Sequence, residues 1–149
     1  MNHMSDFMKL ALDQARQAQA QDEVPIGAII VKDGQVIAMA HNLCECLKDP
    51  TAHAELLAIQ KACSILGEPR LTDCELYVTL EPCAMCAGAI SHARLAKVVY
   101  AAYDPKGGAV DHGSTVFQSP TCLHRPEVIS GVMENESKQL LQSFFIAKR

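Results

Sequence analysis

The sequence has 149 residues, which fits one domain and is long enough to bury a core without disulfide bonds. With 49% hydrophobic and 20% charged residues, it has the composition of a globular protein rather than a disordered one. The net charge of −4 argues against a long nucleic-acid footprint, although it leaves room for a short basic patch. We find no run of 18 apolar residues and no signal-peptide pattern, so we expect no membrane association and a cytoplasmic location.

The first part of the chain predicts a helix followed by a β-hairpin. Residues 6–21 carry large apolar side chains on one helical face, and Ser5 is suited to cap that helix. Two apolar runs follow, at residues 26–31 and 36–40. The Asp33-Gly34 pair between them is a turn signal typical of hairpins.

After the hairpin, helices and strands alternate. Asp49-Pro50 resembles a helix start, with proline at the first helical position, and Gly67 is a suitable stop. The remaining expected elements are a helix over 53–66, a buried strand over 75–80, a helix over 83–94, a strand over 98–102, a loop-rich stretch over 104–120, a short strand at 128–129 and a helix over 135–148. This order predicts an α/β domain with a mixed sheet that helices cover on both faces.

Cysteine usage favours metal chemistry over disulfides. The seven cysteines are an odd number, which argues against a disulfide framework in a chain of this size. Two of them lie in Pro82-Cys83-Ala84-Met85-Cys86, where the spacing places both thiols on one side of a first helical turn. His53-Ala54-Glu55 lies at the start of another predicted helix. Helix N-termini from neighbouring strand–helix units converge at one end of a parallel sheet, so these residues can meet.

His53, Cys83 and Cys86 together form a suitable zinc ligand set. Three protein ligands leave the fourth tetrahedral position to water, which is typical of a catalytic zinc site. Zinc brings the pKa of bound water down to about 7, which supplies hydroxide at neutral pH. Glu55 lies two residues from a ligand and is placed to take a proton from that water and pass it on.

Each motif alone is weak. A lone Cys-x-x-Cys also fits a redox pair or two packed thiols, and a structural zinc site could take a fourth ligand from Cys44, Cys46 or Cys122. The combination of His-x-Glu, a buried strand and Pro-Cys-x-x-Cys is far more specific, and it favours catalytic zinc.

The combined pattern resembles the signature of the zinc nucleoside and nucleobase deaminases. Beyond the signature, the chain resembles the bacterial tRNA-specific adenosine deaminases over nearly its whole length, in residues 23–28, 49–55, 77–90 and 143–145. The resemblance implies a three-layer α/β/α cytidine-deaminase-like fold with about five strands. It also implies one zinc ion per subunit, a homodimer, and conversion of adenosine to inosine at the wobble position of a tRNA anticodon.

The resemblance also assigns roles to individual residues. His53, Cys83 and Cys86 correspond to the zinc ligands and Glu55 to the proton shuttle. Asn42 corresponds to an asparagine that hydrogen-bonds the purine, although a turn asparagine is the other interpretation. The remaining substrate-binding residues would be Ala54, which offers its backbone N–H to the base edge, Val24, Pro25 and Ile26, which line the pocket, and Asp104 and Lys106.

Asp104 and Lys106 lie in a stretch, residues 103–108, that resembles the loop holding the anticodon stem-loop. Lys106 is suited to contact phosphate, and an exposed loop lysine is the alternative. We therefore expect residues 1–149 to form a single zinc-dependent deaminase domain acting on tRNA. Two alternatives stay open at this stage, namely a deaminase of a free base or nucleoside such as guanine or cytosine, and a non-catalytic zinc-bearing RNA-binding module.

Overall fold

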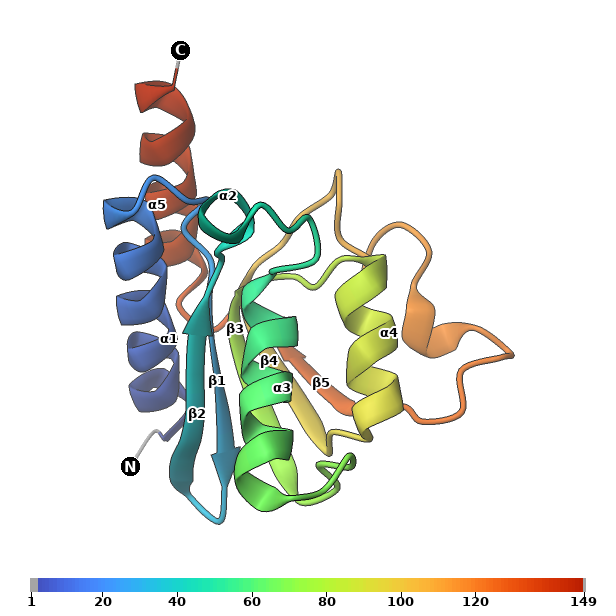
Figure 1. Ribbon diagram of the computed structural model, residues 1–149. Helices are drawn as coiled ribbons and strands as arrows, with labels where there is room; N and C mark the ends of the chain where they lie inside the picture. The colour runs from blue at the N-terminus through green and yellow to red at the C-terminus, as the bar shows by residue number, and fades with distance from the viewer. Residues whose placement is uncertain (1–2, 149) are drawn as a thin grey trace.

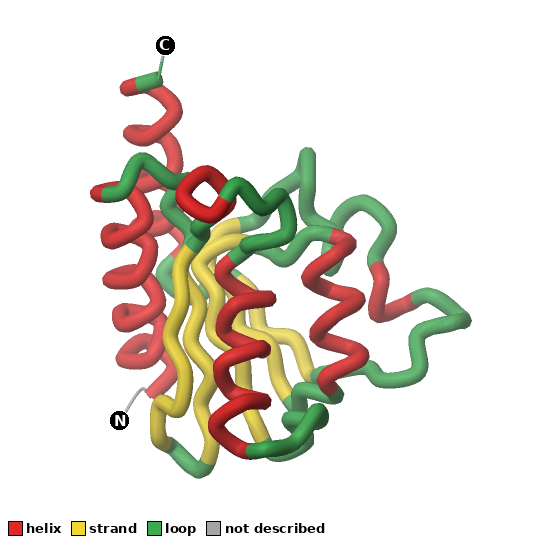
Figure 2. Tube along the Cα trace, in the orientation of Figure 1, coloured by secondary structure: helices red, strands yellow, loops and turns green. Residues whose placement is uncertain are grey.

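A five-stranded mixed sheet forms the centre of the computed structural model, which describes residues 3–148 (Figures 1 and 2). The strand order is β2-β1-β3-β4-β5. Strand β1 is antiparallel to both of its neighbours, whereas β3, β4 and β5 run parallel to one another. The elements in chain order are α1 (His3–Ala20), β1 (Gly27–Lys32), β2 (Gln35–His41), α2 (Cys44–Leu47), α3 (Ala54–Leu66), β3 (Cys74–Leu80), α4 (Ala84–Ala93), β4 (Lys97–Ala102), the 3₁₀ turn η1 (Val116–Gln118), β5 (Glu127–Ser130) and α5 (Glu134–Ala147).

Helices cover both faces of this sheet, which confirms the predicted three-layer α/β/α architecture. Figure 1 shows α1 and α5 on one side and α3 and α4 on the other. Strand β1 serves both cores because successive side chains alternate in direction. Ala28 and Ile30 pack into the core under α3 and α4, whereas Ile29 and Val31 pack under α1. No helix within residues 3–148 is long and apolar enough to cross a membrane.

Helix α1 packs unusually close to the sheet where β1 begins. A side chain at Gly27 would place its Cβ 2.0 Å from the carbonyl oxygen of Ala11, so only glycine permits this approach. The Gly27 N–H donates to the Thr79 hydroxyl at 3.1 Å, which ties β1 to β3 at the same level. The start of β1 is therefore held firmly against the carboxyl end of β3.

Two helix starts differ from the sequence expectation. Ser5 lies inside α1 rather than capping it. Pro50 does not begin a helix, because Asp49 Oδ1 accepts the Thr51 N–H at 2.8 Å and forms a turn there. His53 itself has an extended backbone, at φ −75° and ψ 149°, and α3 begins at Ala54. This turn keeps the His53 side chain at the helix end instead of within a helical turn.

Candidate metal and proton-transfer site

Several chain segments end at one edge of the sheet. Strands β3 and β4 run parallel and are in register at Leu80 and Ala102, so both leave the sheet side by side. Strand β1 is antiparallel to β3, so the start of β1 lies at this same edge. Strand β2 is antiparallel to β1, so β2 ends there as well, and Gly27 pairs with His41. The segments that precede α3 and α4 begin here as well, so residues far apart in sequence meet.

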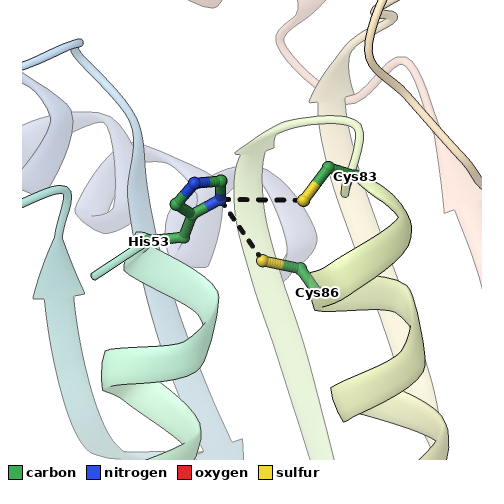
Figure 3. A group of neighbouring side chains, drawn as sticks. All are labelled: His53, Cys83 and Cys86. Carbon is green, nitrogen blue, oxygen red and sulfur yellow. Dashed lines mark hydrogen bonds between the residues drawn. The ribbon is translucent and has the colours of Figure 1, made fainter. Parts of the chain in front are cut away.

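The three predicted metal ligands converge at this edge (Figure 3). His53 Nδ1 lies 3.7 Å from Cys83 Sγ and 3.6 Å from Cys86 Sγ. His53 is the N-cap of α3 and Cys83 the N-cap of α4, while Cys86 lies in the first turn of α4. Both helices thus direct their positive N-terminal ends toward the cluster, which favours thiolate over thiol.

The spacing of these ligand atoms fits a tetrahedral zinc ion. With ordinary Zn–N and Zn–S bonds, a tetrahedral ion holds its nitrogen and sulfur ligands about 3.5 Å apart. The observed distances of 3.6 and 3.7 Å agree with this value. Within residues 3–148 the cluster has no fourth protein member, and Cys44, Cys46 and Cys122 stand apart from it as free thiols. The site therefore has the ligand number of a catalytic zinc rather than of a closed structural one.

The two thiols of the cluster have opposite pKa shifts. The hydrogen bond with Cys86, helped by His53, lowers the pKa of the Cys83 thiol to about 4 despite burial. The same shared bond and its burial raise the pKa of the Cys86 thiol. The pair therefore behaves as one thiolate and one thiol, and a metal ion that binds both sulfurs displaces a proton.

Glu55 lies in the first turn of α3 and is only 4% exposed. Burial raises the pKa of its carboxyl group to about 7, and the nearby Cys83 sulfur adds to the shift. A carboxyl group with a pKa near neutrality can both accept and release a proton at physiological pH. This property suits a proton shuttle beside a metal site.

Asn42 and Ala54 contact each other directly. The Ala54 N–H donates to Asn42 Oδ1 at 2.8 Å, and Asn42 is 6% exposed. The sequence assigns this same N–H to the base edge, and here it is bonded to Asn42. The bond also fixes the amide orientation, because only the oxygen end can accept from a backbone N–H.

Of the three expected pocket-lining residues, Pro25 is buried and Val24 and Ile26 are half-buried. They connect α1 to β1, and the Asn42 N–H donates to the Ile26 carbonyl at 3.1 Å. This bond brings the segment next to Asn42. Val24 also lines an open hollow between the ends of α1, α2 and α5, which includes Phe145.

Asp104 and Lys106 lie in the loop that follows β4. Asp104 is half-buried, and its Oδ1 atom accepts the N–H groups of Lys106 at 3.2 Å and Gly107 at 3.0 Å. The Lys106 side chain is exposed. The Asp104 N–H donates to Glu81 at 3.0 Å, which places the start of this loop beside the segment leading to Cys83.

Sequence reasoning missed two buried carboxylates near the site. Glu81 follows β3 directly, and Glu23 precedes the 24–26 segment; each is 2% exposed. Glu23 accepts the N–H groups of Glu45 at 3.0 Å and Cys46 at 2.6 Å, and so caps α2. The sequence does contain a signal for these two residues. Each acidic residue lies directly beside an apolar run, and a charge buried there needs hydrogen-bond partners.

Comparison with known proteins agrees with this geometry. A family model described as MafB19-like deaminase matches residues 1–149. The tRNA-specific adenosine deaminase of Agrobacterium fabrum is 54% identical over 149 residues, which cover 100% of this chain and 98% of that protein. The tRNA-specific adenosine deaminase of Bacillus subtilis is 48% identical over 139 residues, which cover 93% and 86%.

The same fold occurs in a solved structure. That structure comes from biochemical and structural studies of A-to-I editing by tRNA:A34 deaminases at the wobble position of transfer RNA. It superposes with a TM-score of 0.90 at 55% identity, covering 91% of this chain and 99% of that one. The chain therefore belongs to the deaminase family and, within it, to the tRNA-specific adenosine deaminases.

Proposed function

We propose that residues 1–149 form a single zinc-dependent deaminase domain that converts adenosine to inosine at the wobble position of a tRNA anticodon. The observation that carries the proposal is the three-ligand cluster of His53, Cys83 and Cys86, with the buried carboxyl group of Glu55 on the same helix start. The similarity to tRNA-specific adenosine deaminases supports the substrate.

The reaction replaces the amino group at C6 of adenine with oxygen from water and releases ammonia. When bound, zinc supplies Lewis-acid activation of the attacking water at neutral pH. In our proposal Glu55 accepts a first proton from water and delivers it to a ring nitrogen of the base, and it then transfers a second proton, from the added hydroxyl group, to the amino nitrogen that departs as ammonia. The elevated pKa of Glu55 supports this role, because the same group must take up and release a proton in each cycle.

Asn42 is proposed to orient the purine. Its Oδ1 atom is bonded to the Ala54 N–H, so its Nδ2 group is the end that can donate to an acceptor on the base. The Ala54 N–H therefore contributes by holding Asn42 in place. Pro25, with Val24 and Ile26 on either side, would form the apolar wall against which the extruded base packs.

The RNA backbone is proposed to contact the loop that carries Asp104 and Lys106. Lys106 is exposed and offers a positive charge to a phosphate, while Asp104 fixes the local turn through two backbone bonds. A short contact of this kind is compatible with the net charge of −4, because recognition of an unstacked anticodon base needs a small footprint.

We further propose that the protein works as a homodimer in the cytoplasm. This proposal rests on the resemblance to the tRNA-specific adenosine deaminases. Light scattering is expected to give twice the chain mass of 16.2 kDa. A wild-type protein that is monomeric at micromolar concentration would exclude the dimer.

The test of function is inosine formation by the zinc-loaded protein on an anticodon stem-loop with adenosine at the wobble position. Free adenosine, guanine and cytosine are assayed in parallel. Inosine in the stem-loop alone, with a rate that falls steeply as salt rises, is the expected result. Ammonia release from a free base alone would exclude tRNA as the substrate and leave the deaminase chemistry intact.

A further inference from the structure

A buried carboxylate at the end of β3 holds the loop that follows β4. Glu81 directly precedes Pro82 and Cys83, its residue is 2% exposed, and its side chain has no exposed area. A carboxylate removed from water to this degree needs several hydrogen bonds to remain charged. The partners of Glu81 therefore show what the residue does.

Five N–H groups converge on this one carboxylate. Oε1 accepts the backbone N–H of Asp104 at 3.0 Å and lies 2.8 Å from the His112 ring nitrogen Nδ1. Oε2 accepts the backbone N–H groups of Val110 at 3.1 Å, Asp111 at 2.9 Å and His112 at 3.1 Å. Every partner belongs to residues 104–112, so a single side chain gathers both ends of the loop.

The loop is closed tightly over the carboxylate. A side chain at Gly108 would place its Cβ 2.5 Å from the Glu81 carboxyl carbon and 2.6 Å from the Asp104 carbonyl oxygen. Gly113, at φ +56°, would clash in the same way with the carbonyl oxygen of Gly108. The backbone itself therefore wraps the carboxylate, and the Ala109 N–H adds a bond of 2.8 Å to the Pro82 carbonyl.

The His112 side chain covers the Glu81 carboxylate on the side that faces solvent. Its ring packs edge-on against Tyr103, with centroids 6.1 Å apart, and its side chain is 35% exposed. Tyr100 bonds the neighbouring Asp111 through its hydroxyl group. The loop is thereby attached to β4 as well as to Glu81.

We propose that Glu81 and His112 are a pair of positioning residues that fix residues 104–112 relative to the metal ligand Cys83. Glu81 lies two residues before Cys83, so the same short segment carries the ligand and the anchor of the loop. Because Lys106 lies within the anchored loop, the pair would set where the RNA backbone rests when the base reaches the site. This inference rests on the proposed function for its substrate but not for the anchoring itself.

The test compares Glu81→Gln with a matched change on the same strand, Glu75→Gln. Glu75 is 34% exposed and pairs with Lys97 at the other end of β3. A glutamine at position 81 turns an NH₂ group toward N–H donors, so amide hydrogen exchange in residues 104–113 is expected to accelerate roughly tenfold or more. The KM for the stem-loop is expected to rise about tenfold with little change in kcat, because loop position contributes uniform binding. Zinc content should stay at one per chain.

His112 provides a second variant that disturbs the fold less. His112→Phe keeps the ring contact with Tyr103 but removes the donor to Glu81, and it is expected to raise the KM in the same direction. His112→Asn restores a donor close to the Nδ1 position and should recover most of the wild-type KM. Together these two variants distinguish the effect of the hydrogen bond between His112 and Glu81 from the effect of the ring contact with Tyr103.

Two outcomes would overturn the inference. One is that Glu81→Gln and His112→Phe show the same amide hydrogen exchange in residues 104–113 and the same KM for the stem-loop as the control variant Glu75→Gln. The other is that they lower kcat together with zinc content, which would make Glu81 a support for the metal ligand instead. If the wild-type protein makes no inosine in the stem-loop, the proposed function fails, and the exchange measurement still decides whether Glu81 anchors the loop.

Discussion

Asn42 accepts the backbone N–H of Ala54 at 2.8 Å, and this bond joins the end of β2 to the start of α3. Ala54 follows the proposed metal ligand His53 and precedes the proposed proton shuttle Glu55. The amide that is proposed to orient the base is therefore fixed to the start of α3, next to Glu55. In the proposed mechanism, base recognition and proton transfer would both depend on this helix start.

The first prediction distinguishes the role of the Asn42 carbonyl oxygen from that of its NH₂ group. Asn42→Asp keeps an acceptor for the Ala54 N–H but loses the NH₂ donor, whereas Asn42→Ala loses both. We expect Asn42→Asp to retain the wild-type melting temperature while kcat/KM falls roughly 10- to 100-fold, as for loss of a buried polar contact to substrate. Asn42→Ala is expected to lose about 1 kcal/mol of stability as well. An Asn42→Asp enzyme with unchanged kcat/KM would show that Nδ2 does not contact the base.

A second prediction concerns Glu55. Glu55→Gln preserves the size of this buried side chain and removes its ability to carry a proton. We expect kcat to fall by roughly two to four orders of magnitude, the usual contribution of a general acid–base group. Zinc content, measured by elemental analysis, should stay at one per chain. The exposed Glu45→Gln is the control, and loss of zinc in Glu55→Gln would instead assign Glu55 a role in metal binding.

The fold was largely predictable because its local signals are strong. Asp33 and Gly34 have φ values of +52° and +76°, the left-handed pair that an Asp-Gly turn favours, and the hairpin forms as predicted. The helix start at Asp49-Pro50 was predicted wrongly because this pair suits both a helix start and a turn, whereas the helix expected over 53–66 does form and begins at Ala54. The side-chain bond from Asp49 to Thr51 favours the turn.

The metal cluster was predictable from spacing, but its supports were not. The His53 and Cys83 motifs each lie at a helix start that the sequence reveals, and the sheet topology brings them together. Helix α2 has only four residues and depends on Glu23, which lies more than 20 positions earlier. Glu81 likewise binds backbone N–H groups about 30 residues away. Backbone donors carry no sequence signature, so such partners appear only in the structure.

A third prediction tests how α5 is attached to the sheet. The Ser137 hydroxyl donates to the Thr79 carbonyl in the core, and Ser137 is 1% exposed. Ser137→Ala leaves that buried carbonyl without its donor and is expected to cost about 1–3 kcal/mol in the free energy of unfolding. Ser143→Ala, on the same helix, removes only an exposed bond to Leu140 and should change stability by less than about 0.5 kcal/mol. Equal effects in urea unfolding would contradict the proposed attachment.

The last prediction concerns removal of the metal. His53 is the N-cap of α3, Cys83 is the N-cap of α4 and Cys86 lies in α4, so a bound ion would join the starts of two helices. A chelator is expected to abolish turnover and to lower the melting temperature, and free zinc at 100 times its Kd should restore about 2.7 kcal/mol of stability. Cys86→Ser should lose both zinc and this stabilisation.

Cys122→Ser is the matched control for the metal prediction. Cys122 lies outside the cluster, and its sulfur donates to the His124 carbonyl at 3.1 Å, a bond that a serine hydroxyl can replace. This variant is expected to bind one zinc ion and to keep the wild-type rate. If Cys122→Ser lost zinc as Cys86→Ser does, a fourth thiolate would have to reach the ion, and a closed structural site would replace the open catalytic one.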